Sequence, residues 1–165
     1  MVIDIRRLFD IEGETVPLTY SLDLSDVEHW GVHPFNRPIN LQGEIKSKTG
    51  IVTISYKADI STSLPCDRCL TDVRKECSLN FKHTLVRKLY NEEADESYIL
   101  IENGMLDLTE LATSDIVLEL PSKNLCSEKC KGLCPKCGAN LNQTTCNCVT
   151  KEVDPRFESL LKLLD

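Results

Sequence analysis

Six cysteines fall within residues 125–148. This density constrains the fold more than any other feature, because so many neighbouring thiols must be either cross-linked or bound to metal. The N-terminus reaches charged residues at once and lacks the apolar region of an export signal, which predicts a cytoplasmic protein in a reducing compartment. Disulfides are rare there, so the nine cysteines of the chain indicate metal or redox chemistry.

One pair of cysteines gives the strongest local signal. Cys134 and Cys137, followed by Gly138, place two sulfurs on one metal ion in a tight turn. Zinc prefers four tetrahedral ligands in structural sites, and the nearest downstream pair is Cys146 and Cys148. The polar loop between the two pairs suits a turn that folds back over the metal. The sequence therefore predicts a closed zinc site built from these four cysteines.

Two other pairs remain without partners. Cys66 and Cys69 interrupt a β region like a knuckle at a hairpin tip, whereas Cys126 and Cys130 begin the cysteine-rich stretch. By elimination they share a second zinc ion, which would staple the stretch to the tip of the sheet. A closed four-cysteine site is structural, because no coordination position is left for water or substrate. The alternative is a single site built from Cys126, Cys130, Cys134 and Cys137.

The middle of the chain predicts an antiparallel sheet. Apolar residues alternate over residues 39–45 and again over 52–60, with a turn that ends at Gly50 between them. A third strand over 73–85 carries Cys77 on its apolar face, where we expect a buried free thiol. Further strands are predicted at residues 16–24 and 98–101.

Two helices are predicted in the second half of the chain. Asp107, with Glu110 three residues later, resembles a capping box and predicts a helix from about Leu108 to just before Pro121. A second helix begins near Pro155, and its apolar residues share one face. So short a helix is marginal alone, so we expect it to dock on this chain, on a second copy or on another partner.

Together these elements predict an α+β protein with a mostly antiparallel sheet, one or two helices and a zinc-ribbon-like segment near the C-terminus. We expect an α+β domain with the cysteine hairpin tip over residues 1–120 and a zinc-binding segment over 121–150. The amphipathic helix then occupies 151–165.

The balance of charge limits the classes of function. A net charge of −7 argues against a protein that coats RNA indiscriminately. Lysines nevertheless surround the cysteines, and they either bind phosphate or offset the negative charge of zinc bound to four thiolates. No apolar run is long enough to span a membrane, and no phosphate loop or nucleophile elbow occurs, so we predict a non-enzymatic protein that does not act in a membrane. The candidate RNA-binding residues are Arg68, Lys129, Lys131 and Lys136, with Lys123 and Lys151 nearby.

Several motifs in combination resemble the YceD family, the large ribosomal RNA subunit accumulation proteins. They are PCDRCL at 65–70, LDLTEL at 106–111, the cysteine-rich 125–142, CNC at 146–148 and DPRF at 154–157. The resemblance implies a ribosome biogenesis factor that supports processing or accumulation of large-subunit ribosomal RNA. Its partners would be that RNA or its precursor, a basic ribosomal protein, or both, and no catalytic residue carries over from the family.

The resemblance also implies two separable metal sites, since the first knuckle is widespread in the family and the later cysteines are absent from some members. The two implied sets of metal ligands are Cys66, Cys69, Cys126 and Cys130, and Cys134, Cys137, Cys146 and Cys148.

The alternative function is a zinc-thiolate redox switch or chaperone-like protein, in which oxidation ejects zinc and exposes an apolar surface.

Overall fold

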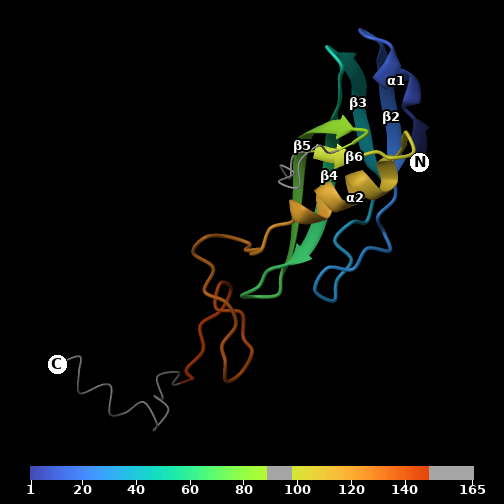
Figure 1. The fold of residues 1–165 in the computed structure, drawn as a ribbon. Coiled ribbons are helices and arrows are strands. Elements are labelled where there is room, and N and C mark those ends of the chain that lie inside the picture. Colours follow the sequence, from blue (N-terminus) through green and yellow to red (C-terminus); the bar gives the residue numbers. More distant parts are fainter. Residues whose placement is uncertain (89–97, 149–165) are drawn as a thin grey trace, which may run out of the picture. The chain divides into compact units, whose positions relative to one another are not determined.

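A five-stranded sheet contains most of the strand residues of the chain. The structure, a computed structural model, describes residues 1–88 and 98–148 (Figure 1). The strand order is β2-β3-β4-β5-β6, in which β2 and β4 both pair antiparallel with β3, whereas β6 lies parallel to the end of β5. The predicted α+β fold with a mostly antiparallel sheet is confirmed. The strands are β2 (Thr15–Leu22), β3 (Ile39–Lys48), β4 (Ile51–Pro65), β5 (Asp72–Val86) and β6 (Tyr98–Leu100).

The hairpin between β3 and β4 turns over only two residues. Thr49 and Gly50 both have positive φ, at 55° and 74°. Two such residues fit a type I′ turn, whose twist matches that of the flanking strands. The predicted turn therefore lies where it was expected, and both strands extend closer to it than their apolar residues alone indicate.

Alternation along β4 places one face of the sheet in the core. The helix α2 (Leu108–Leu118) belongs to the same core through Leu108, Ala112 and Ile116. Asp107 caps this helix as predicted, because its carboxylate accepts hydrogen bonds from the backbone N–H groups of Thr109 and Glu110. The inward residues of β4 are at most 4% exposed: Val52, Ile54, Tyr56, Ala58 and Ile60.

A polar contact also connects α2 to the sheet. The carboxylate of Asp115 accepts a hydrogen bond from the Tyr56 hydroxyl and lies 2.7 Å from Nε2 of His83 on β5. Burial and the neighbouring carboxylate raise the pKa of Tyr56, so the phenol stays protonated and remains a donor. The partly buried polar groups on this face thus satisfy one another.

Three short elements were not predicted. The strands β1 (Val2–Asp4) and β7 (Met105–Asp107) form an antiparallel pair, and α1 (Arg6–Asp10) follows β1. Ile5 and Leu8 are buried in the core of the sheet unit. Because α1 has five residues and no side-chain cap, its stability comes from this burial rather than from local sequence signals.

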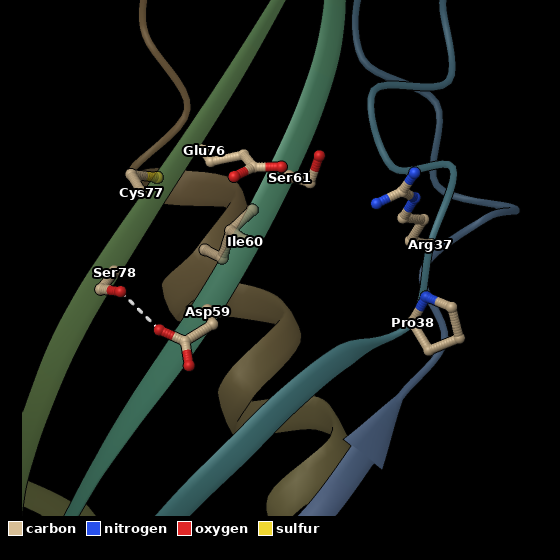
Figure 2. Close-up of a pocket in the computed structure, with 8 residues that line it drawn as sticks. All are labelled: Arg37, Pro38, Asp59, Ile60, Ser61, Glu76, Cys77 and Ser78. Carbon is tan, nitrogen blue, oxygen red and sulfur yellow. Dashed lines mark hydrogen bonds between the residues drawn. The ribbon is translucent and has the colours of Figure 1, made fainter.

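Cys77 is exposed, so the prediction of a buried thiol is wrong. Its strand position matches that of Leu79 and Phe81, which are half-buried, but β5 becomes fully buried only at Leu85. The helix that contributes to this core ends at Leu118, and Figure 2 shows Cys77 near the helix end. Alternation therefore identified the face of the strand but not how far the helix covers it.

A pocket of about 440 Å³ lies on the sheet near the same residues (Figure 2). Its Asp59 carboxylate accepts a hydrogen bond from the Ser78 hydroxyl and is paired with Lys57, and these contacts lower the pKa of Asp59. The Asp59 carboxylate is thus already bound by two side chains of this chain, Ser78 and Lys57. The pocket is lined by Arg37, Pro38, Asp59, Ile60, Ser61, Glu76, Cys77 and Ser78.

The chain divides into two compact units. The sheet unit comprises residues 1–64 and 74–122, and the cysteine unit comprises 65–73 together with the residues from 123 onward, described to 148. Residues 89–97 and the helix predicted at 151–165 lie outside the described residues. No helix in the described part of the chain is long and apolar enough to cross a membrane.

Candidate metal centres

The loop between β4 and β5 presents the first two cysteines of the cysteine unit. The Cys66 N–H donates to the Thr71 carbonyl and the Leu70 N–H donates to the Cys66 carbonyl, both at 2.9 Å. Leu70 adopts a positive φ of 58°, which lets the chain close this tight knuckle. As a result Cys66 and Cys69 are both buried.

Asn124 fastens the later cysteines to this knuckle. Its backbone N–H donates to the Asp67 carboxylate at 2.7 Å, and its carbonyl accepts from the Asp67 N–H at 2.8 Å. Its side-chain amide donates to the Pro65 carbonyl at 3.0 Å, and the residue is only 5% exposed. These bonds bring the segment that carries Cys126 and Cys130 against the knuckle, although the two segments are far apart in sequence.

The four sulfurs of the first cluster, defined as Cys66, Cys69, Cys126 and Cys130, converge within 4.8 Å of one another. The sulfurs of Cys66 and Cys130 are 3.9 Å apart, and those of Cys69 and Cys126 are 3.6 Å apart. Zinc bound tetrahedrally at 2.3 Å from each sulfur gives sulfur–sulfur distances of about 3.8 Å. A disulfide needs about 2.05 Å, so this spacing fits a shared metal and not a cystine.

Electrostatics within the first cluster favour a bound cation. Burial raises the pKa of Cys66, but backbone N–H groups of Cys126, Arg68 and Cys69 outweigh it and lower that pKa to about 6. Hydrogen bonding to the Cys130 and Cys69 sulfurs raises the pKa of Cys126 to about 12. The raised pKa keeps the Cys126 thiol protonated, whereas a divalent cation bound beside it would favour the thiolate.

The second cluster, defined as Cys134, Cys137, Cys146 and Cys148, also converges within 4.8 Å. In its knuckle the Gly138 N–H donates to the Cys134 carbonyl, and the Cys134 N–H donates to the Ala139 carbonyl, both at 2.8 Å. Backbone N–H groups of Cys137 and Lys136 lower the pKa of Cys134 to about 6. Hydrogen bonding to the Cys137 sulfur raises the pKa of Cys148 to about 12.

The two clusters differ in their exposure to solvent. Three sulfur-bearing residues of the first cluster are buried, whereas only Cys134 of the second cluster is buried and Cys137 is exposed. Both groups fit the predicted sets of four cysteines, and the alternative set of 126, 130, 134 and 137 does not form among the described residues. That zinc occupies them remains a prediction.

The candidate RNA-binding residues do not all play the same part. Arg68 donates from its guanidinium to the Cys130 carbonyl at 2.8 Å, so it helps to hold the first cluster together. Lys129 and Lys131 are exposed and adjoin the same cluster in sequence, and Lys136 belongs to the knuckle of the second. Lys151 lies outside the described residues.

Sequence reasoning missed the asparagine and threonine side chains that surround the sulfurs. The Thr71 hydroxyl lies 3.4 Å from the Cys69 sulfur, and the Asn142 side-chain amide lies 3.2 Å from the Cys130 sulfur. The only available signal was the polar character of the loop between the cysteine pairs. That character predicted a turn, but not which sulfur the turn would reach.

Gly132 and Gly138 offer a matched pair of substitutions. Both have a left-handed φ, 76° and 72°, so alanine costs about 1–2 kcal/mol at either position. At Gly132 a Cβ would also lie 3.0 Å from the Arg68 carbonyl oxygen, whereas at Gly138 it would meet nothing within 4 Å. We expect Gly132→Ala to weaken zinc retention more than Gly138→Ala does, as measured by competition with a chromogenic chelator. Equal losses of zinc retention in the two variants would show that the close approach of Gly132 to the Arg68 carbonyl does not matter for metal binding.

Comparison with known proteins identifies the family. Residues 54–164 match the family described as large ribosomal RNA subunit accumulation protein YceD. The chain belongs to the YceD family. The match includes both cysteine clusters, so the residues that could hold metal lie within the part of the chain that the family model matches.

Two curated proteins resemble most of the chain, and a third resembles about a third of it. YlbN of Bacillus subtilis is 27% identical over 128 residues, which cover 77% of this chain and 74% of YlbN. Rv2926c of Mycobacterium tuberculosis is 25% identical over 175 aligned positions, covering 99% of this chain and 81% of the relative. An Arabidopsis thaliana protein named large ribosomal RNA subunit accumulation protein YCED homolog 1, chloroplastic, is 36% identical over 55 residues, covering 33% of this chain and 17% of that protein. No solved structure matches the chain.

Proposed function

We propose that this protein acts in assembly of the large ribosomal subunit and supports accumulation of its RNA without catalysing a reaction itself. Membership of the YceD family carries the proposal, because the family is described by large ribosomal RNA subunit accumulation. The geometry supports the non-enzymatic part of the proposal. Two closed groups of four thiols leave a bound metal no open position for water or substrate.

Zinc is the metal that the residues fit best. The eight cysteines of the two clusters would hold two ions, since four thiolates at tetrahedral spacing are a typical structural zinc site. When bound, zinc supplies folding free energy and neutralises thiolate charge. Arg68 and Asn124 of this chain position the sulfurs by binding the backbone on both sides of the first cluster.

The cysteine unit is the part of the protein that we propose contacts RNA. Its described residues include five lysines and arginines against three acidic residues, whereas the whole chain has 19 basic and 26 acidic residues. Exposed Lys129 and Lys131, together with Lys136, would contact RNA phosphates. The rest of the chain is acidic, so it would favour binding to a basic ribosomal protein. Such a role agrees with the predicted cytoplasmic location.

Co-sedimentation with ribosomal precursors tests this proposal. We expect the purified, zinc-loaded protein to sediment with large-subunit precursors, and its depletion from cells to reduce the large-subunit pool. Replacing Lys129, Lys131 and Lys136 by Glu should reduce the bound fraction about tenfold or more at moderate salt, because each exchange removes a phosphate contact. The salt dependence of binding should fall as well, since fewer phosphates are contacted. The same exchange at exposed Lys48, Lys82 and Lys88 of the sheet unit is the matched control. An unchanged ribosome profile after depletion would contradict the proposal.

The exposure of Cys137 favours a second candidate, an oxidation-responsive switch. Two thiolates of the second cluster would be oxidised by hydrogen peroxide to a disulfide, with two protons taken up, two waters formed and the zinc ion released. Peroxide titration with a zinc indicator distinguishes the two roles. Release at micromolar peroxide supports the switch, and release only under harsh oxidation leaves the structural role.

A further inference from the structure

The loop between the two halves of the second cluster reaches the first cluster. Asn142 lies between Cys137 and Cys146 in sequence, yet its side-chain Nδ2 donates to the sulfur of Cys130 at 3.2 Å. Cys130 belongs to the first cluster. One side chain carried by the second metal site is therefore a hydrogen-bond donor to a ligand of the first.

The surrounding bonds fix the orientation of this amide. Oδ1 of Asn142 accepts from the Lys131 N–H at 2.8 Å, so the donor Nδ2 is the atom that faces the sulfur. The Asn142 N–H in turn donates to Oδ1 of Asn140 at 3.0 Å, and the Leu141 N–H donates to the Gly132 carbonyl at 2.9 Å. The contact is thus part of an ordered turn and does not depend on a single rotatable side chain.

The same loop also reaches the other half of the first cluster. The Asn140 side-chain amide donates to the Thr71 hydroxyl at 3.5 Å, and that hydroxyl lies 3.4 Å from the Cys69 sulfur. Cys69 and Cys130 come from the two segments whose cysteines form the first cluster. The loop therefore contacts both segments and is placed to oppose their separation.

We propose that metal in the second cluster stabilises metal in the first, through the hydrogen bond from Asn142 to Cys130. The inference rests on the proposed binding of zinc by both clusters. Metal at the second cluster ties together both ends of the loop and holds Asn142 in place. The donated N–H stabilises the thiolate charge, so the first ion leaves more slowly while the second remains.

The difference in burial sets the order of release. The first cluster contains Cys66, Cys69 and Cys130 at 5% exposure or less, whereas Cys137 and the partly exposed Cys146 and Cys148 leave the second cluster more open to a chelator. The exposed site therefore loses zinc first. The buried site then becomes labile, which makes the second cluster the control point for retention of both ions.

Zinc release from the full-length, zinc-loaded protein into a chromogenic chelator tests the coupling. In the unaltered protein we expect both ions to leave together at the rate set by the second cluster, because the first ion is held until the second cluster is empty. In Asn142→Leu, which keeps all eight thiols, the ion of the first cluster should leave about tenfold faster than in the unaltered protein, as expected for loss of a hydrogen bond to a charged group. Gln143→Leu is the matched control, because the Gln143 side chain is exposed and makes no hydrogen bond to a described residue.

A double-mutant cycle assigns the effect to this bond. Removing the second site with Cys146→Ser and Cys148→Ser should accelerate release from the first site by a similar factor, and adding Asn142→Leu should change the rate less than twofold. Equal rates of release from the first cluster in Asn142→Leu and Gln143→Leu overturn the coupling, and so does a multiplicative effect in the combined variant. If the serine variant does not fold, the leucine pair alone decides. A protein that binds fewer than two zinc ions contradicts the proposed metal sites, whereas two ions released independently contradict only the coupling.

Discussion

Stripping bound zinc from the protein should unfold the cysteine unit and leave the five-stranded sheet folded. Among the described residues of the cysteine unit, the buried cluster consists of Cys66, Cys69 and Cys130, and three half-buried apolar side chains pack against it: Val73, Leu125 and Leu133. So little apolar surface cannot offset the entropy of ordering the chain. Structural zinc contributes about 10–16 kcal/mol in small domains, which is comparable to the whole stability of a typical protein.

Hydrogen exchange followed by NMR measures this effect unit by unit. With a strong chelator and a reductant, we expect amides of residues 123–148 to lose protection while those of β3 and β4 keep it. Cys66→Ser, which removes one ligand of the first cluster, should reduce protection in residues 123–130 as the chelator does, and Cys77→Ser is the matched control because Cys77 belongs to neither cluster. Continued protection of residues 123–148 in metal-free protein would show that zinc does not hold the unit together.

Placing a side chain at Gly43 should destabilise the sheet unit by about 3 kcal/mol. Gly43 lies on β3 opposite Leu18 of β2 and Tyr56 of β4, in the interior of the sheet. A Cβ there would lie 2.1 Å from the Ser55 carbonyl oxygen and 2.6 Å from the Cα of Tyr56. Because both are backbone atoms, neither can rotate away, and the two strands must separate locally.

Urea denaturation of Gly43→Val, followed by the far-ultraviolet circular dichroism of the sheet, measures this cost. Gln42→Val is the matched control, since Gln42 is exposed on the same strand and its replacement should change the free energy of unfolding by less than about 0.5 kcal/mol. If Gly43→Val lowers the free energy of unfolding no more than the control does, the strands can relax around the new side chain.

Alternation made the central sheet predictable, because burial on one face leaves a period of two in the sequence. Every inward residue predicted for β4 between Val52 and Ile60 is buried. The same rule was wrong about the burial of Cys77 on β5, since alternation carries no information on where α2 ends. The short helix α1 also escaped prediction, because burial of Leu8 stabilises it and no local cap marks it.

Spacing made the cysteine groups predictable in a similar way. Pairs with one to three residues between their cysteines can reach one metal ion, and counting the remaining pairs gave the two groups that the structure brings together. The supporting contacts were not predictable from spacing. Asn124 and Asn142 act across distant parts of the chain, and their partners depend on the path of the backbone rather than on neighbouring residues.

The hairpin that carries Cys66 and Cys69 has a consequence during protein synthesis. Cys69 precedes its neighbour Cys126 by 57 residues. At elongation rates of about 5–20 residues per second, the ribosome makes the first half of this site roughly 3–11 s before the second half exists. During that interval the nascent chain carries Cys66 and Cys69 without the other two cysteines of their cluster. An oxidant or a competing metal can react with these two thiols before Cys126 and Cys130 are synthesised.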